Sequence, residues 1–215
     1  RSIPRNWQLT FVIDPHDNKP VHCGWVALSP PAPVSFAVWY RHAVLSDMTI
    51  PQVCRYVLDL EERFGERIHR RIMDPNFGQK IQGNTKTRVR EDYARHGLSC
   101  IMAEDCLRAG HLRVRQWLHY DVNRPVGRDN FPLMYFSDEL TTMIQSMERY
   151  AYAPGAGGKP ALVGEAIPSE AYKDPCDLVR YFVMQNPDWA PPDYEMTGSG
   201  VLVPIRKGRE YELNQ

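Results

Sequence analysis

Four aspartates stand where carboxylates from separate elements would meet. Asp14 ends an apolar run, and Asp74 ends the run 67–73. Asp174 and Asp177 belong to the stretch KDPCDLVRYF. Carboxylates from separate elements can hold two divalent cations, Mg²⁺ or Mn²⁺, about 3.5–4 Å apart, and such a pair can hydrolyse a phosphodiester. The pattern therefore indicates a candidate site for metal-dependent hydrolysis.

Each aspartate also has a structural interpretation. Asp-Pro after a strand is a common start of a turn, which would account for Asp14 and Asp74 without any catalysis. Asp174 followed by Pro175 is a good helix N-cap, and Asp177 would then lie in the first turn, where the helix dipole favours an acid. Taken singly, the aspartates fit these structural roles better. Their order along the chain, strand-Asp, strand-Asp, helix-Asp, favours the catalytic interpretation.

The elements that must position these residues begin with three strands, predicted at 8–14, 21–28 and 34–45. Their short connections, which carry Pro and Asn, predict an antiparallel meander. A helix is predicted from the cap residue Thr49 to Gly65, before the strand 67–73. A crossover back to a parallel strand would bring Asp74 beside Asp14 at the end of the sheet.

Helices and short strands continue along the second half of the chain. Helices are predicted at 86–96 and 106–120, and short strands at 99–103 and 133–136. Ser137 is expected to cap a helix with the buried stripe Leu140, Met143, Ile144, Met147 and Tyr150. Residues 1–190 are predicted to form one α/β domain, and 191–215 a proline-rich tail for which partial disorder is expected.

Composition limits the functional classes. Basic and acidic residues balance at 26 each, so DNA binding has to rest on local charge. The five cysteines include no CxxC spacing, which argues against a disulfide framework or a structural zinc site and favours a reducing compartment. No apolar run approaches the roughly 18 residues of a membrane span, so no membrane partner is expected.

Basic side chains gather in two segments, 79–95 and 106–120. Phosphate recognition needs Lys and Arg, although a charged helix face is more often simply solvated. The candidates for DNA contact are Lys80, Lys86, Arg88, Arg90, Arg108, Arg113, Arg115 and Lys173. His16, two residues after Asp14, can lie near a metal, but a turn residue is the simpler interpretation.

From Leu9 to about Trp189 the chain resembles the nuclease domain of the large terminase subunits of tailed bacteriophages. The segments that carry the resemblance are FVIDPHDN, RRIMDPNFG, KTRVREDYARHG, LTTMIQSMERYAY and KDPCDLVRYF. It implies a ribonuclease H-like α/β fold, with a mixed central sheet of an antiparallel three-strand meander and parallel strands, flanked by helices. It also implies an endonuclease that cleaves concatemeric double-stranded viral DNA during genome packaging.

By this resemblance Asp14 matches the first acidic motif and would bridge two divalent cations, Mg²⁺ or Mn²⁺. Asp74 matches the second motif, and Asp177 or Asp174 the third, a choice that stays open. Lys173 stands where the family often carries a His or another acid, and it either contacts phosphate or is a solvated lysine. The implied partners are double-stranded DNA, an ATPase motor domain in the same polypeptide, the small terminase subunit and the portal. The expected location is the host-cell cytoplasm, and the isolated domain is expected to be monomeric.

The sequence departs from full-length large terminases in having no GxxxxGK(S/T) phosphate loop. That is expected of an excised nuclease half or of a stand-alone relative, and the first residue, an Arg rather than Met, favours excision. Two rival functions remain. One is another ribonuclease H-like nuclease, such as a junction resolvase or a transposase-like enzyme. The other is a non-catalytic DNA-binding or scaffold domain, in which the aspartates only start turns and cap helices.

Overall fold

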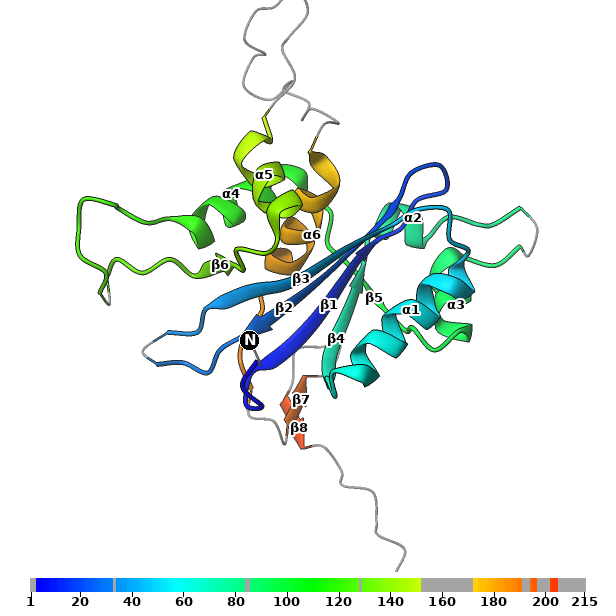
Figure 1. The fold of residues 1–215 in the computed structure, drawn as a ribbon, viewed down its shortest axis with the longest axis horizontal. Helices are drawn as coiled ribbons and strands as arrows, with labels where there is room; N and C mark the ends of the chain where they lie inside the picture. The colour runs from blue at the N-terminus through cyan, green and yellow to red at the C-terminus, as the bar shows by residue number, and fades with distance from the viewer. Residues whose placement is uncertain are drawn as a thin grey trace, which may run out of the picture.

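A computed structural model describes residues 3–32, 34–83, 86–127, 129–151, 172–190, 194–196 and 202–204. Its centre is a six-stranded sheet in the order β5-β4-β1-β2-β3-β6 (Figure 1). The strands are β1 (Gln8–Asp14), β2 (Val21–Leu28), β3 (Ala37–Leu45), β4 (Ile68–Met73), β5 (Ile101–Met102) and β6 (Met134–Phe136). The helices are α1 (Ile50–Arg63), α2 (Pro75–Gly78), α3 (Val89–Arg95), α4 (Leu107–Leu118), α5 (Thr141–Arg149) and α6 (Lys173–Met184). In the tail, β7 (Tyr194–Met196) pairs antiparallel with β8 (Leu202–Pro204).

The sheet is mixed, as the sequence predicts. β1, β2 and β3 form the antiparallel meander. β4 returns after α1 to pair parallel with β1, β5 pairs parallel with β4, and β6 pairs parallel with β3. The predicted α/β class, a meander extended by parallel strands and flanked by helices, is confirmed.

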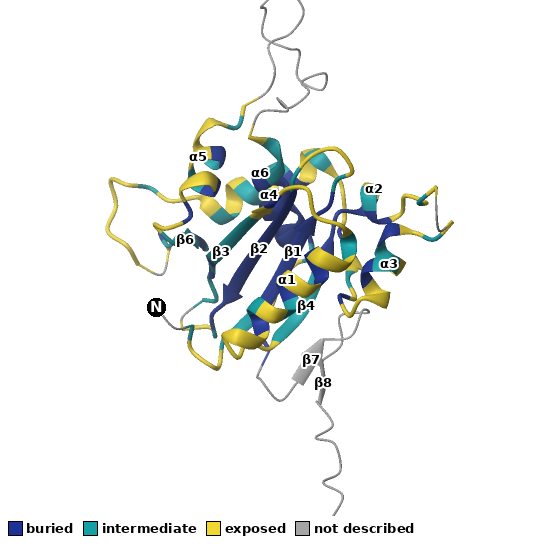
Figure 2. Cartoon of the chain, turned by 45° about the vertical axis from the view of Figure 1, so that its right-hand side comes forward, coloured by how far each residue is buried: buried dark blue, intermediate teal, exposed yellow. Residues whose placement is uncertain are grey.

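Helices cover both faces of the sheet. α1 and α3 lie on one face, and α6 lies on the other together with α4 and α5 (Figure 1). Successive side chains of β1 alternate between the layers, so that Phe11 and Ile13 pack toward α1 while Val12 packs toward α6. Because both faces are covered, β2 is buried along its whole length (Figure 2).

Helix α6 is enclosed between the sheet and the helices α4 and α5. Residues 175–184 are all buried, as expected of a helix that is apolar on nearly every side. Gly24 of β2 lets the side chains of Trp39 and Leu178 lie close to the β2 backbone. A Cβ at this position would lie 2.6 Å from Trp39 Cζ3 and 3.2 Å from Leu178 Cδ1. The absence of a side chain at this position therefore leaves room both for the Trp39 ring and for Leu178 of α6.

We expect Gly24→Ala to lower the free energy of unfolding by about 1–3 kcal/mol, because the added methyl overpacks a closed core. Urea denaturation measures the change. Gly127→Ala is the matched control, because its added Cβ would meet nothing within 4 Å. The control is expected to change stability by no more than about 0.5 kcal/mol. Equal stability of the two variants would contradict this account of the α6 packing.

Three helix starts differ from the predictions, and the first is that of α3, which begins at Val89 rather than at Lys86. Ser137 does not cap α5, because its N–H donates to the carbonyl of Trp39 at 2.9 Å and keeps the chain extended beside β3. The helix therefore begins only at Thr141. α6 begins at Lys173 with Tyr172 at its N-cap, so the interpretation of Asp174 as the N-cap is wrong.

Among the described helices, none has the length and apolar content to cross a membrane.

Candidate active site

The aspartates at the ends of β1 and β4 lie side by side. Ile13 and Met73 are partners in the parallel register, and the next residue of each strand is an aspartate. The N–H of Asp74 donates to the carbonyl of Ile13 at 3.0 Å, which extends the pairing to the end of the sheet. The predicted placement of Asp74 beside Asp14 is therefore observed.

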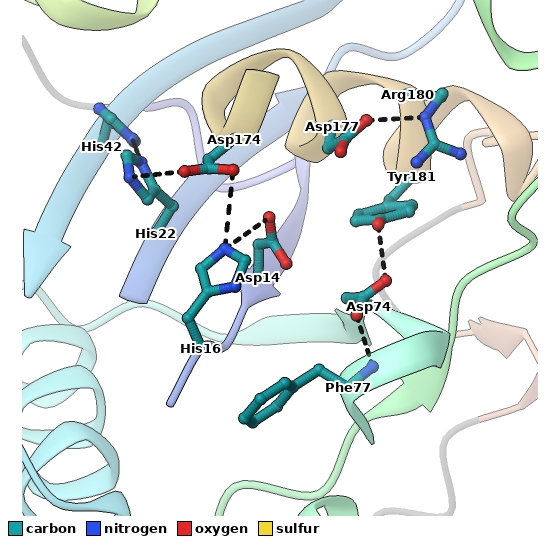
Figure 3. A network of polar contacts seen from close by, with 10 residues as sticks. All are labelled: Asp14, His16, His22, His42, Asp74, Phe77, Asp174, Asp177, Arg180 and Tyr181. Atoms are coloured by element: carbon teal, nitrogen blue, oxygen red, sulfur yellow. Dashed lines mark hydrogen bonds and ion pairs between the residues drawn. The ribbon is translucent and has the colours of Figure 1, made fainter. Parts of the chain in front are cut away.

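Helix α6 supplies the other two carboxylates above this edge of the sheet (Figure 3). All four aspartates line one pocket of about 330 Å³. The remaining lining residues are His16, Lys19, Asn76, Phe77, Lys173 and Tyr181. Asp14, Asp74 and Asp177 are only 3%, 5% and 3% exposed. Carboxylates so deeply buried need charged or hydrogen-bonding partners, and the pocket supplies them.

Asp74 is held through both of its carboxylate oxygens. Its Oδ2 accepts the N–H of Phe77 at 2.6 Å, which caps α2, and its Oδ1 accepts the hydroxyl of Tyr181 at 2.6 Å. The turn-and-cap interpretation of Asp74 is thus correct locally, yet the same carboxylate faces the pocket. Since each carboxylate oxygen has two lone pairs, capping leaves Asp74 able to bind a cation.

Asp177 is paired with a buried arginine. Its Oδ1 accepts Nε–H of Arg180 at 2.9 Å, and a second N–H of the guanidinium donates to Oδ1 of Asp105 at 2.7 Å. The other oxygen of Asp105 accepts the side-chain amide of Asn76 at 2.5 Å. Burial raises the pKa of Asp177, although Arg180 opposes the rise. The chain Asp177–Arg180–Asp105–Asn76 therefore connects α6 to α2 across the pocket wall.

His16 lies between the carboxylates of Asp14 and Asp174, on the side of the pocket away from Asp74 and Asp177 (Figure 3). Its Nε2 is 3.4 Å from Asp14 Oδ2 and 3.6 Å from Asp174 Oδ1. The interpretation of His16 as a turn residue is therefore incomplete. The signal in the sequence is its position two residues after Asp14, in the same turn.

Two further histidines were not anticipated. His22 Nε2 lies 3.7 Å from Asp174 Oδ2, and its Nδ1 lies 3.3 Å from Nε2 of His42, whose ring stacks on it. Burial lowers the pKa of His22, and burial followed by the charge of His22 lowers the pKa of His42 to about 4. Burial therefore favours the neutral form of both imidazoles, although the charge of Asp174 opposes it at His22.

The pKa values on the His16 side follow from burial and from this histidine. Burial raises the pKa of Asp14 to about 6, although His16 opposes it. Burial alone would raise the pKa of Asp174 as well, but His16, His22 and Lys19 outweigh it and lower the pKa. Contact with Asp14 and then with Asp174 raises the pKa of His16 to about 10. Without a metal, His16 is accordingly the cation that balances Asp14 and Asp174.

A pH dependence of stability follows for the metal-free protein. The pKa of His16 is about 10 in the folded state and 6.5 as its ordinary value, so the folded state binds this proton more tightly. Its stabilising contribution is complete below about pH 6.5 and is lost as the pH rises through about 10. We expect the melting-temperature difference between wild type and His16→Gln, measured in EDTA, to shrink steadily from pH 7 to pH 10. A difference independent of pH would contradict the ion pairs of His16.

The predicted DNA-contact residues do not gather in one region. Lys173 lines the pocket together with Lys19, which the sequence did not single out. Lys80 forms an ion pair with Asp17 at the surface. The others lie outside the pocket. Lys86, Arg88 and Arg90 lie at or just before α3, and Arg108, Arg113 and Arg115 lie on α4. These two helices are on opposite faces of the sheet (Figure 1).

The donor set fits hard divalent cations. Four carboxylates in one pocket supply the oxygen ligands that Mg²⁺ and Mn²⁺ prefer. Desolvation raises the pKa of Asp14 and of Asp177 despite His16 and Arg180, which means that these partners only partly compensate the ionised forms for lost water. A bound cation would supply that compensation.

Comparison with known proteins gives no match to a family model and none to a curated protein sequence. Solved structures do match. The P22 large terminase nuclease domain superposes with a TM-score of 0.59 at 15% identity, covering 86% of this chain and 84% of that one. The chain has the fold of a large terminase nuclease domain. The ribonuclease H-like arrangement predicted from the sequence is confirmed with it.

Two further terminase structures show the same fold. The large terminase nuclease domain of bacteriophage SPP1, solved with bound Mn, has a TM-score of 0.55 at 13% identity and covers 85% of this chain and 89% of that one. The large terminase of a thermophilic bacteriophage has a TM-score of 0.56 at 18% identity. The match covers 85% of this chain, and this chain spans 41% of that protein's length.

Proposed function

We propose that this chain is a terminase nuclease domain, a metal-dependent endonuclease that cleaves concatemeric double-stranded viral DNA during genome packaging. The observation that carries the proposal is the convergence of Asp14, Asp74 and Asp177 in one pocket of a large terminase nuclease fold. The SPP1 domain of the same fold was solved with Mn, which supports a divalent cation in this pocket.

The proposed cofactors are two divalent cations, Mg²⁺ or Mn²⁺. Asp14, Asp74 and Asp177 would hold them, with Asp174 as a fourth ligand. Bound there, the two ions would activate a water and stabilise the leaving oxygen of the phosphodiester. The protein's own part is to fix the carboxylates. Tyr181 and the N–H of Phe77 orient Asp74, and Arg180 orients Asp177.

Substrate binding is assigned to the lysines at the pocket. Lys19 and Lys173 line it and would meet the phosphates on either side of the scissile bond. Lys80, Lys86, Arg88, Arg90, Arg108, Arg113 and Arg115 are proposed contacts to more distant phosphates. Contacts to phosphates position a duplex without reading its bases, so little sequence preference is expected. The proposed partners of the full-length protein are an ATPase motor domain, the small terminase subunit and the portal, in the host-cell cytoplasm.

The test is digestion of supercoiled and linear plasmid DNA with Mg²⁺, Mn²⁺ or EDTA. We expect nicking and linearisation with either metal and none with EDTA. Cleavage confined to branched DNA would favour a junction resolvase of the same fold. No cutting with any metal would contradict the proposal, and no gain in melting temperature on adding Mn²⁺ would then favour a non-catalytic DNA-binding domain.

A further inference from the structure

One side of the pocket contains a nitrogen donor. Asp14, His16 and Asp174 each offer one ligand atom, and these three atoms lie within 4.8 Å of one another. His16 Nε2 is shielded from solvent and has no partner within hydrogen-bonding geometry. In the metal-free protein this nitrogen therefore faces two carboxylate oxygens at ion-pair distance without a formed hydrogen bond to either.

The distances at His16 are long for hydrogen bonds but suitable for ligands of one ion. Charge-assisted N–H···O bonds are about 2.7–2.9 Å long, whereas Nε2 lies 3.4 Å and 3.6 Å from the two oxygens. Neighbouring ligands of an octahedral ion, each about 2.1 Å from the metal, are about 3 Å apart. A small contraction would therefore bring all three atoms onto one cation.

Surrounding residues hold this donor set in place. His16 lies edge-on to Phe77, with ring centroids 6.3 Å apart. His22 lies beside the second oxygen of Asp174, at 3.7 Å, which leaves the first oxygen directed at His16. Such outer partners orient ligands and tune the metal they bind.

The other side of the pocket offers oxygen only. Asp74 and Asp177 face it, and their partners are the hydroxyl of Tyr181, the N–H of Phe77 and the guanidinium of Arg180. None of these partners is a metal ligand. The two sides of the pocket thus differ in chemistry, with one N/O set and one all-oxygen set.

We propose that His16 Nε2, Asp14 and Asp174 form one cation position whose nitrogen ligand makes it select Mn²⁺ over Mg²⁺. The inference rests on the proposed function, because it assigns one ion of the same site. Mg²⁺ demands oxygen ligands and gives up water reluctantly, whereas first-row transition ions accept imidazole. Asp74 and Asp177, with a second oxygen of Asp14, remain for an ion of either kind.

The experiment uses the 215-residue chain, stripped of metal and titrated with Mn²⁺ alone or Mg²⁺ alone by calorimetry. Pulsed electron paramagnetic resonance of bound Mn²⁺ detects a directly bonded histidine nitrogen. We expect this nitrogen coupling in wild type and its loss in His16→Ala. We also expect the affinity for Mn²⁺ to fall at least about tenfold in His16→Ala, and the affinity for Mg²⁺ to fall less. His96→Ala, which removes a histidine outside the pocket, should keep the coupling and both affinities.

Absence of the coupling in wild type, or its persistence in His16→Ala, would overturn the proposal. An equal fall of both affinities would overturn the selectivity. Circular dichroism checks the fold, and if His16→Ala fails to fold, His16→Gln tests the same point because an amide supplies no imidazole nitrogen.

The experiments distinguish failure of the His16 assignment from failure of the proposed nuclease function. Metal-dependent cutting by wild type without nitrogen coupling would overturn the His16 assignment alone. Nitrogen coupling without any cutting would overturn the nuclease and keep the cation position.

Discussion

Asp14→Asn is expected to reduce metal-dependent plasmid cleavage by about a thousandfold, because losing a proposed metal ligand removes several kcal/mol of transition-state stabilisation. The same change should leave the metal-free fold intact. Burial raises the pKa of Asp14 to about 6, so its charge at pH 7.5 is unfavourable in the folded state. A neutral side chain of the same shape should therefore melt at the same or a higher temperature in EDTA. Cleavage assays and thermal unfolding together measure both effects.

The matched control for Asp14→Asn is Asp59→Asn, on the exposed side of α1. It should cut DNA as wild type does. If Asp14→Asn cut DNA as fast as wild type in both Mg²⁺ and Mn²⁺, Asp14 would not belong to the proposed centre. Adding Mn²⁺ should raise the melting temperature of wild type, and it should do so much less in Asp14→Asn, because only the folded state holds the ion.

Arg180→Met is expected to destabilise the metal-free protein by about 3–5 kcal/mol, because it leaves buried Asp177 as an unpaired charge. Arg180 is 2% exposed and is bonded to both Asp177 and Asp105. Its stem also packs directly on Gly110, where an added Cβ would lie 2.5 Å from Cγ of Arg180. Urea denaturation in EDTA measures the loss. Adding Mn²⁺ should recover part of it by supplying a new positive partner for Asp177.

A double variant shows whether the loss arises from the charge. Asp177→Asn removes the carboxylate that Arg180→Met leaves unpaired, so Asp177→Asn/Arg180→Met should be more stable than the sum of the single changes predicts. Arg95→Met, at the exposed C-terminal end of α3, is the control and should alter stability by no more than about 0.5 kcal/mol. Strict additivity in the double variant would show that Arg180 acts through packing alone.

The sheet and the strand-end aspartates could be predicted because their signals are local. A β-branched run defines β1, both β1 and β4 stop at Asp-Pro, and the intervening helical period of α1 implies the parallel return. Burial of Trp25 and Trp39 likewise follows from their strands. The start of α5 could not be predicted from Ser137, since a hydrogen bond to Trp39, distant in sequence, overrides the local capping signal.

The partners of the aspartates could not be predicted because they depend on packing between distant elements. Tyr181 reaches Asp74 and Arg180 reaches Asp105 only once α6 is seated on the sheet. One signal was available. Arg180 stands alone in the apolar segment LVRYFVM, and an arginine that a helix buries needs an acidic partner. The sequence does not show which acid that is.

The enclosed position of α6 affects when the proposed centre forms. The strands that carry Asp14 and Asp74 leave the ribosome before helix α6, because α6 lies later in the chain. A product that stops before Lys173 lacks Asp174 and Asp177, and also the helix that fills one face of the sheet. Completing the core and completing the proposed centre are therefore the same event. Truncated or half-made copies would be harmless to the DNA around them, and cutting capacity would arrive only with the finished fold.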